Sequence, residues 1–420
     1  MGIKKNVFCS LLVTGAVSCF VSAGSVEEPF EVGTWANFCK GAVSHTFDDN
    51  TSNQLSMGVP LFNEKGFHMT IFTSQSFNPD WNGLKNAFEQ GHEIGSHSIG
   101  HNSMATDFAA SQKAIQDNVP GEKCISYAYP YCENPGGATE VYVAARDCDG
   151  YPNPTTPDDF GKIKSQITGT TQYNGINDLQ GMNNLADIAV EENGWCVYLH
   201  HGVEGDYNFA ATSLHLLEGN LDYLNENRDK VWCETFGNVA RYIKERDAAT
   251  VKKKDSDSKT ITVEVTDNLD DDIFDYPLSI RLPVEETWSS PSVKQADKEV
   301  EDTIVEVDGK KYLMFQAVPD GGDVVITTGE TTGIKNRVGF NSNTAPVYRT
   351  HSTLVINRRH FGHNIEVSLF NLAGKTIAHY MLSSTETTIE LKGNYFSGSA
   401  FIARVTDGVT TYSHFCTPKM

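Results

Sequence analysis

The sequence has few basic residues: 33 Lys and Arg stand against 54 Asp and Glu, a net charge of -21. Nucleic-acid phosphates and anionic lipids repel such a chain, so roles at nucleic acids or membrane surfaces are disfavoured. Beyond the N-terminal segment no apolar run reaches the ~18 residues of a membrane span. No two cysteines have CxxC spacing, which speaks against a zinc ribbon or a thioredoxin-type site. With 39% hydrophobic residues in 420, the sequence predicts a compact protein of two or three domains.

The N-terminal segment has the pattern of a secretory signal peptide. Lys4 and Lys5 precede an apolar run over residues 7–21, and small residues end at Ala23. We expect cleavage after Ala23, removal of residues 1–23, and a secreted protein that is extracellular or at the cell surface. A lipoprotein signal acylated at Cys19 is the alternative.

Cysteine usage agrees with secretion. Of the 9 cysteines, Cys9 and Cys19 lie in the segment that is removed, so seven remain. An odd number in an oxidising compartment predicts some disulfides and at least one thiol that stays free or pairs between chains. The pairing cannot be assigned from one sequence.

From residue 41 to 247, short apolar runs alternate with helical patterns, which predicts an α/β barrel with parallel strands inside and helices outside. Leucines spaced by three and four residues in the third helix predict a buried stripe. The expected strands are Gly41–Phe47, Phe67–Phe72, Ile125–Tyr129, Trp195–Leu199 and Val231–Thr235, and the expected helices are Trp81–Gln90, Ser111–Asn118, Leu214–Asn225 and Val239–Arg246.

The helical period ends near residue 250. Residues 251–258 are polar and charged, which predicts a solvated linker. Runs of strand pattern separated by turn signals then predict an Ig-like β-sandwich over 259–330 and a second small β-module over 334–420. The expected order is a signal peptide (1–23), an α/β catalytic domain (24–250) and these two β-modules.

Two clusters near predicted strand ends have the residue types of a metal site. Asp48 and Asp49 follow the first strand, where either solvent or a cation must offset their repulsion. His97 and His101 are four residues apart, the spacing at which two imidazoles on one helical turn reach one metal. Asp49 is the carboxylate that completes a two-His, one-carboxylate site with positions left open for water and substrate.

Two further clusters lie later in the same order. Residues 127–131 read Tyr-Ala-Tyr-Pro-Tyr and end at Tyr131, and residues 198–202 read Tyr-Leu-His-His-Gly. His200 and His201 alternate along a strand, so only one of them can face the barrel mouth. Each cluster alone fits ordinary packing, but four in this order indicate one site.

The order TFDD, HSxxH, YPY and LHHG resembles the polysaccharide deacetylases, carbohydrate esterase family 4, whose fold is the NodB-homology domain. Residues 232–246 also resemble the closing segment of that domain, so the resemblance covers residues 41–247. It implies a distorted (β/α) barrel and a metal-dependent hydrolase that removes acetyl groups from sugars. Asp49, His97 and His101 would bind a divalent metal, with zinc the first choice and cobalt an alternative.

The resemblance also implies roles for the other residues. Asp48 would be the general base, the Tyr131 amide part of the oxyanion hole, and a late histidine the general acid. A single His before Gly is common in the family, which favours His201 over His200. Many members have an Arg two residues before the proline of the third motif, where this chain has Ala128, so Asp48 loses one support. A fourth motif is missing, with Asp147 and Asp149 as weak stand-ins.

The C-terminal module shows a second resemblance. Residues 367–375 and 396–405 resemble the C-terminal sorting domain of substrates of type IX secretion. The resemblance implies that secretion machinery recognises this module. Another Ig-like accessory module is the alternative.

The sequence therefore predicts a secreted, metal-dependent deacetylase of an acetylated polysaccharide, with acetyl xylan the preferred substrate. N-deacetylation of chitin or peptidoglycan is the sister hypothesis. A non-catalytic carbohydrate-binding protein on the same barrel is a second class, and a cyclic amidase is a third. No nucleic-acid partner and no transmembrane span are expected.

Overall fold

The computed structural model describes residues 24–148, 150–206, 209–257, 259–286, 288, 291–328, 347–349, 353–356, 365–370, 375–383, 388–390, 401–406 and 411–416. The predicted signal peptide lies outside these residues. Within them, each helix is too short or too polar to cross a membrane.

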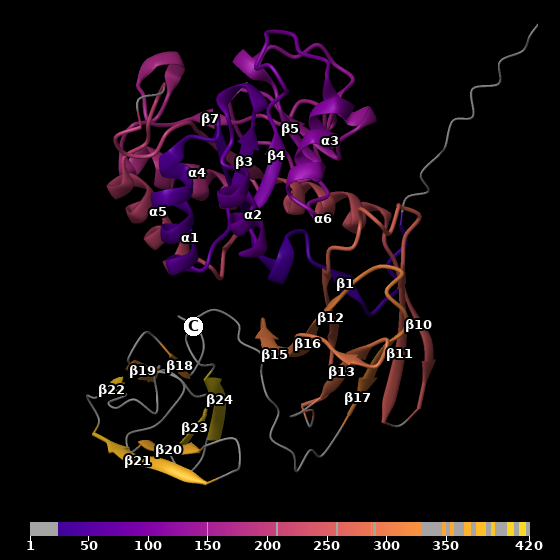
Figure 1. Cartoon of the computed structure of the whole chain (residues 1–420). Helices are drawn as coiled ribbons and strands as arrows, with labels where there is room; N and C mark the ends of the chain where they lie inside the picture. The colour runs from indigo at the N-terminus through magenta and orange to yellow at the C-terminus, as the bar shows by residue number, and fades with distance from the viewer. Residues whose placement is uncertain are drawn as a thin grey trace, which may run out of the picture.

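The first unit is built on a curled sheet of parallel strands, drawn from indigo to magenta in Figure 1. The strand order is β6-β5-β4-β3-β2-β8-β7, and β9 pairs with β2. This arrangement fits the predicted barrel of the NodB type. The strands are β2 (Gly41–Asp48), β3 (Thr70–Thr73), β4 (Glu93–Ser96), β5 (Ser126–Ala128), β6 (Ala144–Arg146), β7 (Gln166–Ile167), β8 (Trp195–His200) and β9 (Val231–Cys233).

Six α-helices pack around this sheet: α1 (Val59–Lys65), α2 (Trp81–Glu89), α3 (Phe108–Asn118), α4 (Leu179–Glu191), α5 (Leu214–Glu226) and α6 (Phe236–Ala248). Their starts follow local capping chemistry, because Asp80 and Asp178 accept backbone N–H groups of α2 and α4 and Ser213 does so for α5. The predicted leucine stripe on α5 is confirmed, since Leu217, Leu221 and Leu224 are buried.

All five strands and four helices predicted in this unit are present, with ends shifted by a few residues. Strand β4 was not predicted, because its Glu-Ile-Gly-Ser sequence lacks an apolar run. Glu93 is nevertheless buried there, where its carboxylate accepts hydrogen bonds from Thr70, Ser126 and the Gly237 N–H. Hydrogen bonding in place of water lets a polar sequence form a central strand.

Two antiparallel sheets follow, drawn mostly in orange in Figure 1. Their strand orders are β1-β12-β16-β15 and β10-β11-β17-β13-β14. The strands are β1 (Glu31–Val32), β10 (Thr250–Ser256), β11 (Thr260–Thr266), β12 (Leu278–Pro283), β13 (Ser292–Gln295), β14 (Lys298–Glu299), β15 (Asp302–Val307), β16 (Lys310–Ala317) and β17 (Val324–Thr327). We call these two sheets together the β-unit.

The predicted linker over residues 251–258 is wrong. Residues 250–256 form strand β10, which pairs antiparallel with β11 from Thr250↔Thr266 to Ser256↔Ile261. Strand β10 lies at the edge of its sheet, with Val251 buried and the three lysines after it exposed. Lysines on an edge strand discourage pairing with other chains, which is why this strand has the composition of a linker.

The barrel and the β-unit share one hydrophobic core. Trp232 and Tyr242 from the barrel belong to the same cluster of buried residues as Leu278 and Phe315 from the β-unit. Strand β1 precedes the barrel in sequence but pairs with β12, which follows it. The barrel is therefore inserted between two strands of the β-unit.

A buried acid lies at this junction. Glu245 of α6 is fully buried and accepts the Tyr276 N–H at 2.9 Å through Oε1, while Oε2 has no hydrogen-bond partner. Burial raises the pKa of Glu245 to about 8. The carboxyl group is then protonated in the folded chain at neutral pH and ionised in the unfolded one.

We expect the wild type to lose stability as pH rises from about 4.5 to about 8, because only the unfolded state releases this proton easily. Glu245→Gln keeps the acceptor for Tyr276 and does not titrate. Its melting temperature should exceed that of the wild type by several degrees at pH 8 and by little at pH 4.5. The difference at pH 8 corresponds to a gain on the order of 2 kcal/mol in the free energy of unfolding. Thermal melts at both pH values test this, with the exposed Glu226→Gln as control. Equal gains at both pH values would contradict it.

The C-terminal strands form two further sheets around a small core of their own. The described strands are β18 (Val347–Arg349), β19 (Thr353–Ile356), β20 (Ile365–Phe370), β21 (Thr376–Leu382), β22 (Thr388–Glu390), β23 (Phe401–Thr406) and β24 (Thr411–Cys416). The predicted second β-module agrees with these strands, and its glycine-rich turns lie outside the described residues.

Candidate active site

The four sequence clusters meet at the carboxyl edge of the parallel sheet. Asp48 ends β2 and Asp49 follows it, His97 follows β4, Tyr131 lies just after β5, and His201 follows β8. Because parallel strands end on the same edge, residues up to 153 positions apart in the chain come together there.

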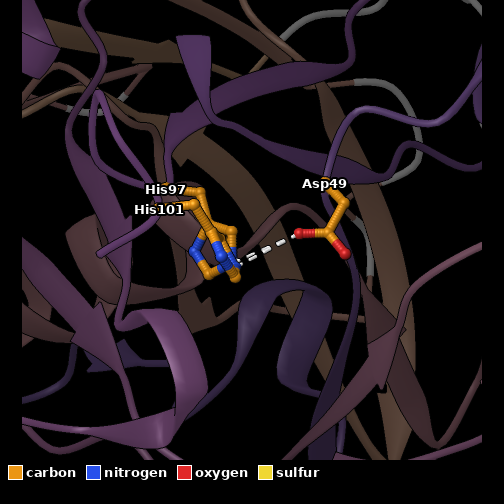
Figure 2. Close-up of side chains that lie close together, drawn as sticks. All are labelled: Asp49, His97 and His101. Carbon is orange, nitrogen blue, oxygen red and sulfur yellow. Dashed lines mark hydrogen bonds and ion pairs between the residues drawn. The ribbon is translucent and has the colours of Figure 1, made fainter. Parts of the chain in front are cut away.

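Asp49, His97 and His101, which we call the metal triad, point at one another in Figure 2. The Nε2 atoms of the two histidines are 3.1 Å apart, and Asp49 Oδ1 lies 3.4 Å from His101 Nε2 and 3.7 Å from His97 Nε2. These separations are close to the ~3.3 Å between ligand atoms around a tetrahedral metal with bonds of ~2.0–2.1 Å.

The tautomer of His97 also fits a metal ligand. Its Nδ1 lies 2.8 Å from the Ala128 carbonyl, an acceptor, so Nδ1 bears the proton and Nε2 presents a lone pair to the centre of the triad. Burial lowers the pKa of His97 to about 4 and also lowers the pKa of His101. Both rings are therefore neutral at pH 7, the form that binds metal.

The helical turn predicted for His97 and His101 is wrong. Both lie in the loop after β4, where the His101 N–H donates to Ser98 Oγ and the His101 backbone is left-handed (φ 49°). Asp49 is also left-handed (φ 71°). Strained backbone at two of the three candidate ligands is typical of functional sites, where the surrounding fold holds the strain.

Asp48 is buried and paired with an arginine that sequence reasoning did not find. Arg146, the last residue of β6, donates from Nη2 to Asp48 Oδ2 at 2.6 Å, and both residues are buried. Burial raises the pKa of Asp48, but the charges of Arg146, His97 and His201 together lower it by more than burial raises it. The net shift of this pKa is downward. Asp48 is therefore ionised, and the Arg146 guanidinium is the cation that offsets its charge.

The expected loss of support for Asp48 at Ala128 is therefore also wrong. Ala128 and Arg146 are direct partners in the β5–β6 ladder. The guanidinium comes from the neighbouring strand at the same level of the sheet. The apolar run over residues 142–145 could have indicated a strand that ends at Arg146. Only the strand register shows that the Arg146 side chain contacts Asp48.

The two late histidines face opposite sides of the sheet, as predicted. His200 is buried toward the helices, where it contacts His45 Nδ1 at 3.0 Å and Thr168 Oγ1 at 2.6 Å. His201 instead lies close enough to Asp48 that each shifts the pKa of the other. Burial lowers the pKa of His201, and the charge of Asp48 opposes that shift.

His201 has no carboxylate partner on its Nδ1, which is buried without a hydrogen bond in the described structure. Asp147 does not serve this role, because its oxygens accept from Asn134 and from the Cys148 N–H. Asp149, the other weak stand-in, lies outside the described residues. The lack of a clear fourth motif in the sequence therefore agrees with the lack of a carboxylate partner for His201 in the described structure.

Tyr131 begins an exposed loop beside the triad. Its backbone is left-handed (φ 57°), its side chain is 64% exposed, and its ring centroid lies 4.7 Å from that of His101. A disulfide joins the next residue, Cys132, to Cys148, which follows β6. The expectation of both paired and free cysteines is confirmed, since Cys39, Cys124, Cys196 and Cys233 are free.

Residues 36–145 match the family model for polysaccharide deacetylases. This part of the chain is similar to the polysaccharide deacetylases. The match spans the region from the helical turn before β2 to β6, and it includes Asp48 and the metal triad. His201 lies beyond the matched residues.

A gellan lyase from a Bacillus species is 31% identical to the chain over 324 residues, which cover 70% of this chain and 13% of that protein. The chain thus spans about an eighth of that relative. Among solved structures, the CE4 domain of a multidomain xylanase from the hindgut metagenome of Trinervitermes trinervoides is 17% identical, with a TM-score of 0.35 over 47% of this chain and 89% of that one. The family 4 carbohydrate esterase of Streptomyces lividans is 16% identical, with a TM-score of 0.33 over 46% and 92%.

Proposed function

We propose that this protein is a metal-dependent hydrolase that removes acetyl groups from a polysaccharide. One observation supports this most directly: an ionised, arginine-held Asp48 lies beside a two-His, one-Asp triad at the same strand edge. A protein that only binds sugar needs no buried base next to a metal site. Acetyl xylan is the preferred substrate, and N-acetylated chitin or peptidoglycan is the alternative, because the same groups attack an ester or an amide.

The proposed chemistry gives each residue one task. Asp49, His97 and His101 would hold a divalent ion, with zinc the first choice, which would supply a water of lowered pKa and polarisation of the acetyl carbonyl. Asp48 takes the proton of the attacking water. The Tyr131 amide donates to the oxygen that becomes negative. His201 then donates a proton to the leaving oxygen or nitrogen as its bond to the acyl carbon breaks, and acetate is released.

We also propose an extracellular or cell-surface location. The signal-peptide pattern over residues 1–23 and the sorting-domain resemblance of residues 367–375 and 396–405 support it. The Cys132–Cys148 disulfide agrees with an oxidising compartment.

Acetate release by the purified protein tests the proposed reaction. Acetylated xylan and an N-acetylated chitin oligosaccharide are compared with zinc or cobalt present and after chelation, and bound metal is measured by mass spectrometry. We expect metal-dependent release from acetylated xylan and about one equivalent of metal, lost in His97→Ala. Release from the chitin oligosaccharide alone would show that the enzyme hydrolyses an acetyl amide rather than an acetyl ester.

A failure has two distinguishable forms. Bound metal without release from either polymer would reject both substrates and point to another acylated sugar. If the protein binds no metal and releases no acetate, the enzyme is rejected and the carbohydrate-binding protein is favoured. The absence of a hydrogen-bond partner for His201 Nδ1 in the described structure would agree with that outcome.

A further inference from the structure

The loop after β5 is cross-linked to the end of the neighbouring strand. A disulfide joins Cys132, the residue after Tyr131, to Cys148, which lies shortly after Arg146. Strands β5 and β6 are adjacent and parallel. One covalent bond therefore connects the turn whose Tyr131 amide is proposed to stabilise the oxyanion with the strand whose Arg146 holds Asp48.

The backbone of this turn has a conformation that side chains disfavour. Tyr131 (φ 57°) and Cys132 (φ 60°) are both left-handed, and neither is a glycine. For each such residue the left-handed conformation is disfavoured roughly 10-fold relative to the right-handed one. A free loop would relax out of two such residues in succession, and the Tyr131 amide would turn away with them. The surrounding structure has to hold this turn in place.

The noncovalent contacts of the turn lie at or near the surface. Tyr131 is 64% exposed, and Cys132 is exposed as well. The Cys132 N–H donates to the Tyr129 carbonyl at 3.1 Å, and farther along the loop the Asn134 amide donates to Asp147 at 3.2 Å. Water competes for hydrogen bonds at such positions. The disulfide is therefore the strongest link between this turn and β6 in the described structure.

The disulfide is also accessible to a reductant in solution. Cys132 is exposed and Cys148 is half-buried. Burial raises the pKa of the thiols that are free in the described structure, which are Cys39, Cys124, Cys196 and Cys233. A thiol with a raised pKa forms little of the thiolate that attacks a disulfide. An external thiol can thus open this bond, whereas these four thiols exchange with it slowly.

We propose that the Cys132–Cys148 disulfide is a positioning element of the active site: it holds Tyr131 and Cys132 left-handed, and the hydrolase is fully active only while the bond is formed. This inference rests on the proposed function and adds to it a dependence on oxidation state. A dithiol such as dithiothreitol breaks the S–S bond by supplying two electrons and two protons. The dithiol becomes a cyclic disulfide, and two cysteine thiols remain.

Two unlinked variants of the full chain test the proposal, and they differ only at position 132. The alanine variant, Cys132→Ala with Cys148→Ala, removes the bond and leaves a residue that disfavours the left-handed backbone. The glycine variant, Cys132→Gly with Cys148→Ala, removes the same bond but tolerates that backbone. Leu313→Ala, in the buried core of the β-unit, is the control for lost stability alone. Melting temperature and bound metal are measured for each protein.

The kinetics are measured on the polymer that the wild type deacetylates. We expect kcat of the alanine variant to fall about 30-fold with KM within about twofold, because loss of one oxyanion donor costs up to ~10²–10³ in kcat. The glycine variant should stay within about fivefold of the wild-type kcat. Both should melt below the wild type, and Leu313→Ala should do so with unchanged kcat. An unchanged kcat in the alanine variant, or equal losses in the two unlinked variants, would overturn the proposal.

Reduction of the wild type is an independent test. Dithiothreitol should lower its kcat about 30-fold, and reoxidation should restore it, while the alanine variant should not respond. Thiol titration shows that the bond has opened. An undiminished kcat after opening, or an equal response of the alanine variant, would overturn the dependence on this bond.

Loss of the proposed function would be visible separately. Amide hydrogen exchange in a peptide covering residues 129–137, read by mass spectrometry, requires no activity. We expect the turn to exchange faster in the alanine variant than in the wild type, because the Cys132 N–H loses its hydrogen bond to Tyr129. If the wild type releases acetate from no polymer, the deacetylase is rejected and this exchange alone decides. Faster exchange would support the positioning of the turn, and equal exchange would overturn it.

Discussion

We expect the Asp48→Asn variant to release acetate about 10³-fold more slowly than the wild type, with bound metal unchanged. Asparagine has the shape of aspartate but cannot accept the proton of the attacking water. The metal triad does not include Asp48, so metal content should stay near that of the wild type. Single-turnover acetate release and metal analysis on the same preparation test this.

Stability provides the necessary control for Asp48→Asn. The substitution leaves the buried Arg146 guanidinium without its carboxylate, which should destabilise the fold. Replacing both partners, in Asp48→Asn with Arg146→Met, should restore much of that stability without restoring activity. Recovery of activity in the double variant would show that Asp48 is not the base.

The second large effect is expected at Arg146. Arg146→Met removes the guanidinium that holds Asp48 Oδ2 and also donates to Thr46 Oγ1. We expect kcat to fall about 100-fold, because a misplaced base is inefficient. The free energy of unfolding should fall by about 3 kcal/mol, because a buried carboxylate loses its partner. Steady-state kinetics and chemical denaturation measure the two effects.

A relocated arginine separates positioning of Asp48 from a merely structural role. Ala128 lies directly opposite Arg146 in the β5–β6 ladder. The variant Ala128→Arg with Arg146→Ala therefore moves the guanidinium across one strand, into space that the lost side chain leaves. We expect it to regain at least about tenfold of the lost kcat, whereas Ala128→Arg alone should only overpack the core. No regain in a well-folded double variant would contradict positioning through Asp48.

The sequence was sufficient for residues in recognisable motifs, including His97, although the strand before it, β4, was not predicted. Asp49, His97 and His101 were predicted as one site, and the structure brings them within 3.7 Å of one another. Their meeting depends only on the common edge of parallel strands. The catalytic roles of Asp48, Tyr131 and His201 stay predictions.

The sequence was insufficient where a contact depends on register or on tertiary burial. Arg146 contacts Asp48 across 98 residues of sequence, and no local pattern encodes that pairing. The predicted linker was wrong for a similar reason. Residues 250–256 form strand β10, whose exposed lysines gave it the composition of a linker, and it pairs with β11 on both sides of a bulge between Lys253 and Asp255. Polar composition indicates exposure to water, which an edge strand and a linker have in common.

The insertion of the barrel within the β-unit determines the order in which the chain can fold. Strand β1 is synthesised early, but Glu31 can pair with Arg281 only after a further 250 residues have been synthesised. At ~5–20 residues per second, that interval lasts roughly 10–50 s, during which the barrel emerges complete. Its apolar underside, including Trp232 and Tyr242, stays uncovered until the later strands arrive. A fragment that stops at the end of α6 would leave this surface permanently open to aggregation, although every proposed catalytic residue would be present.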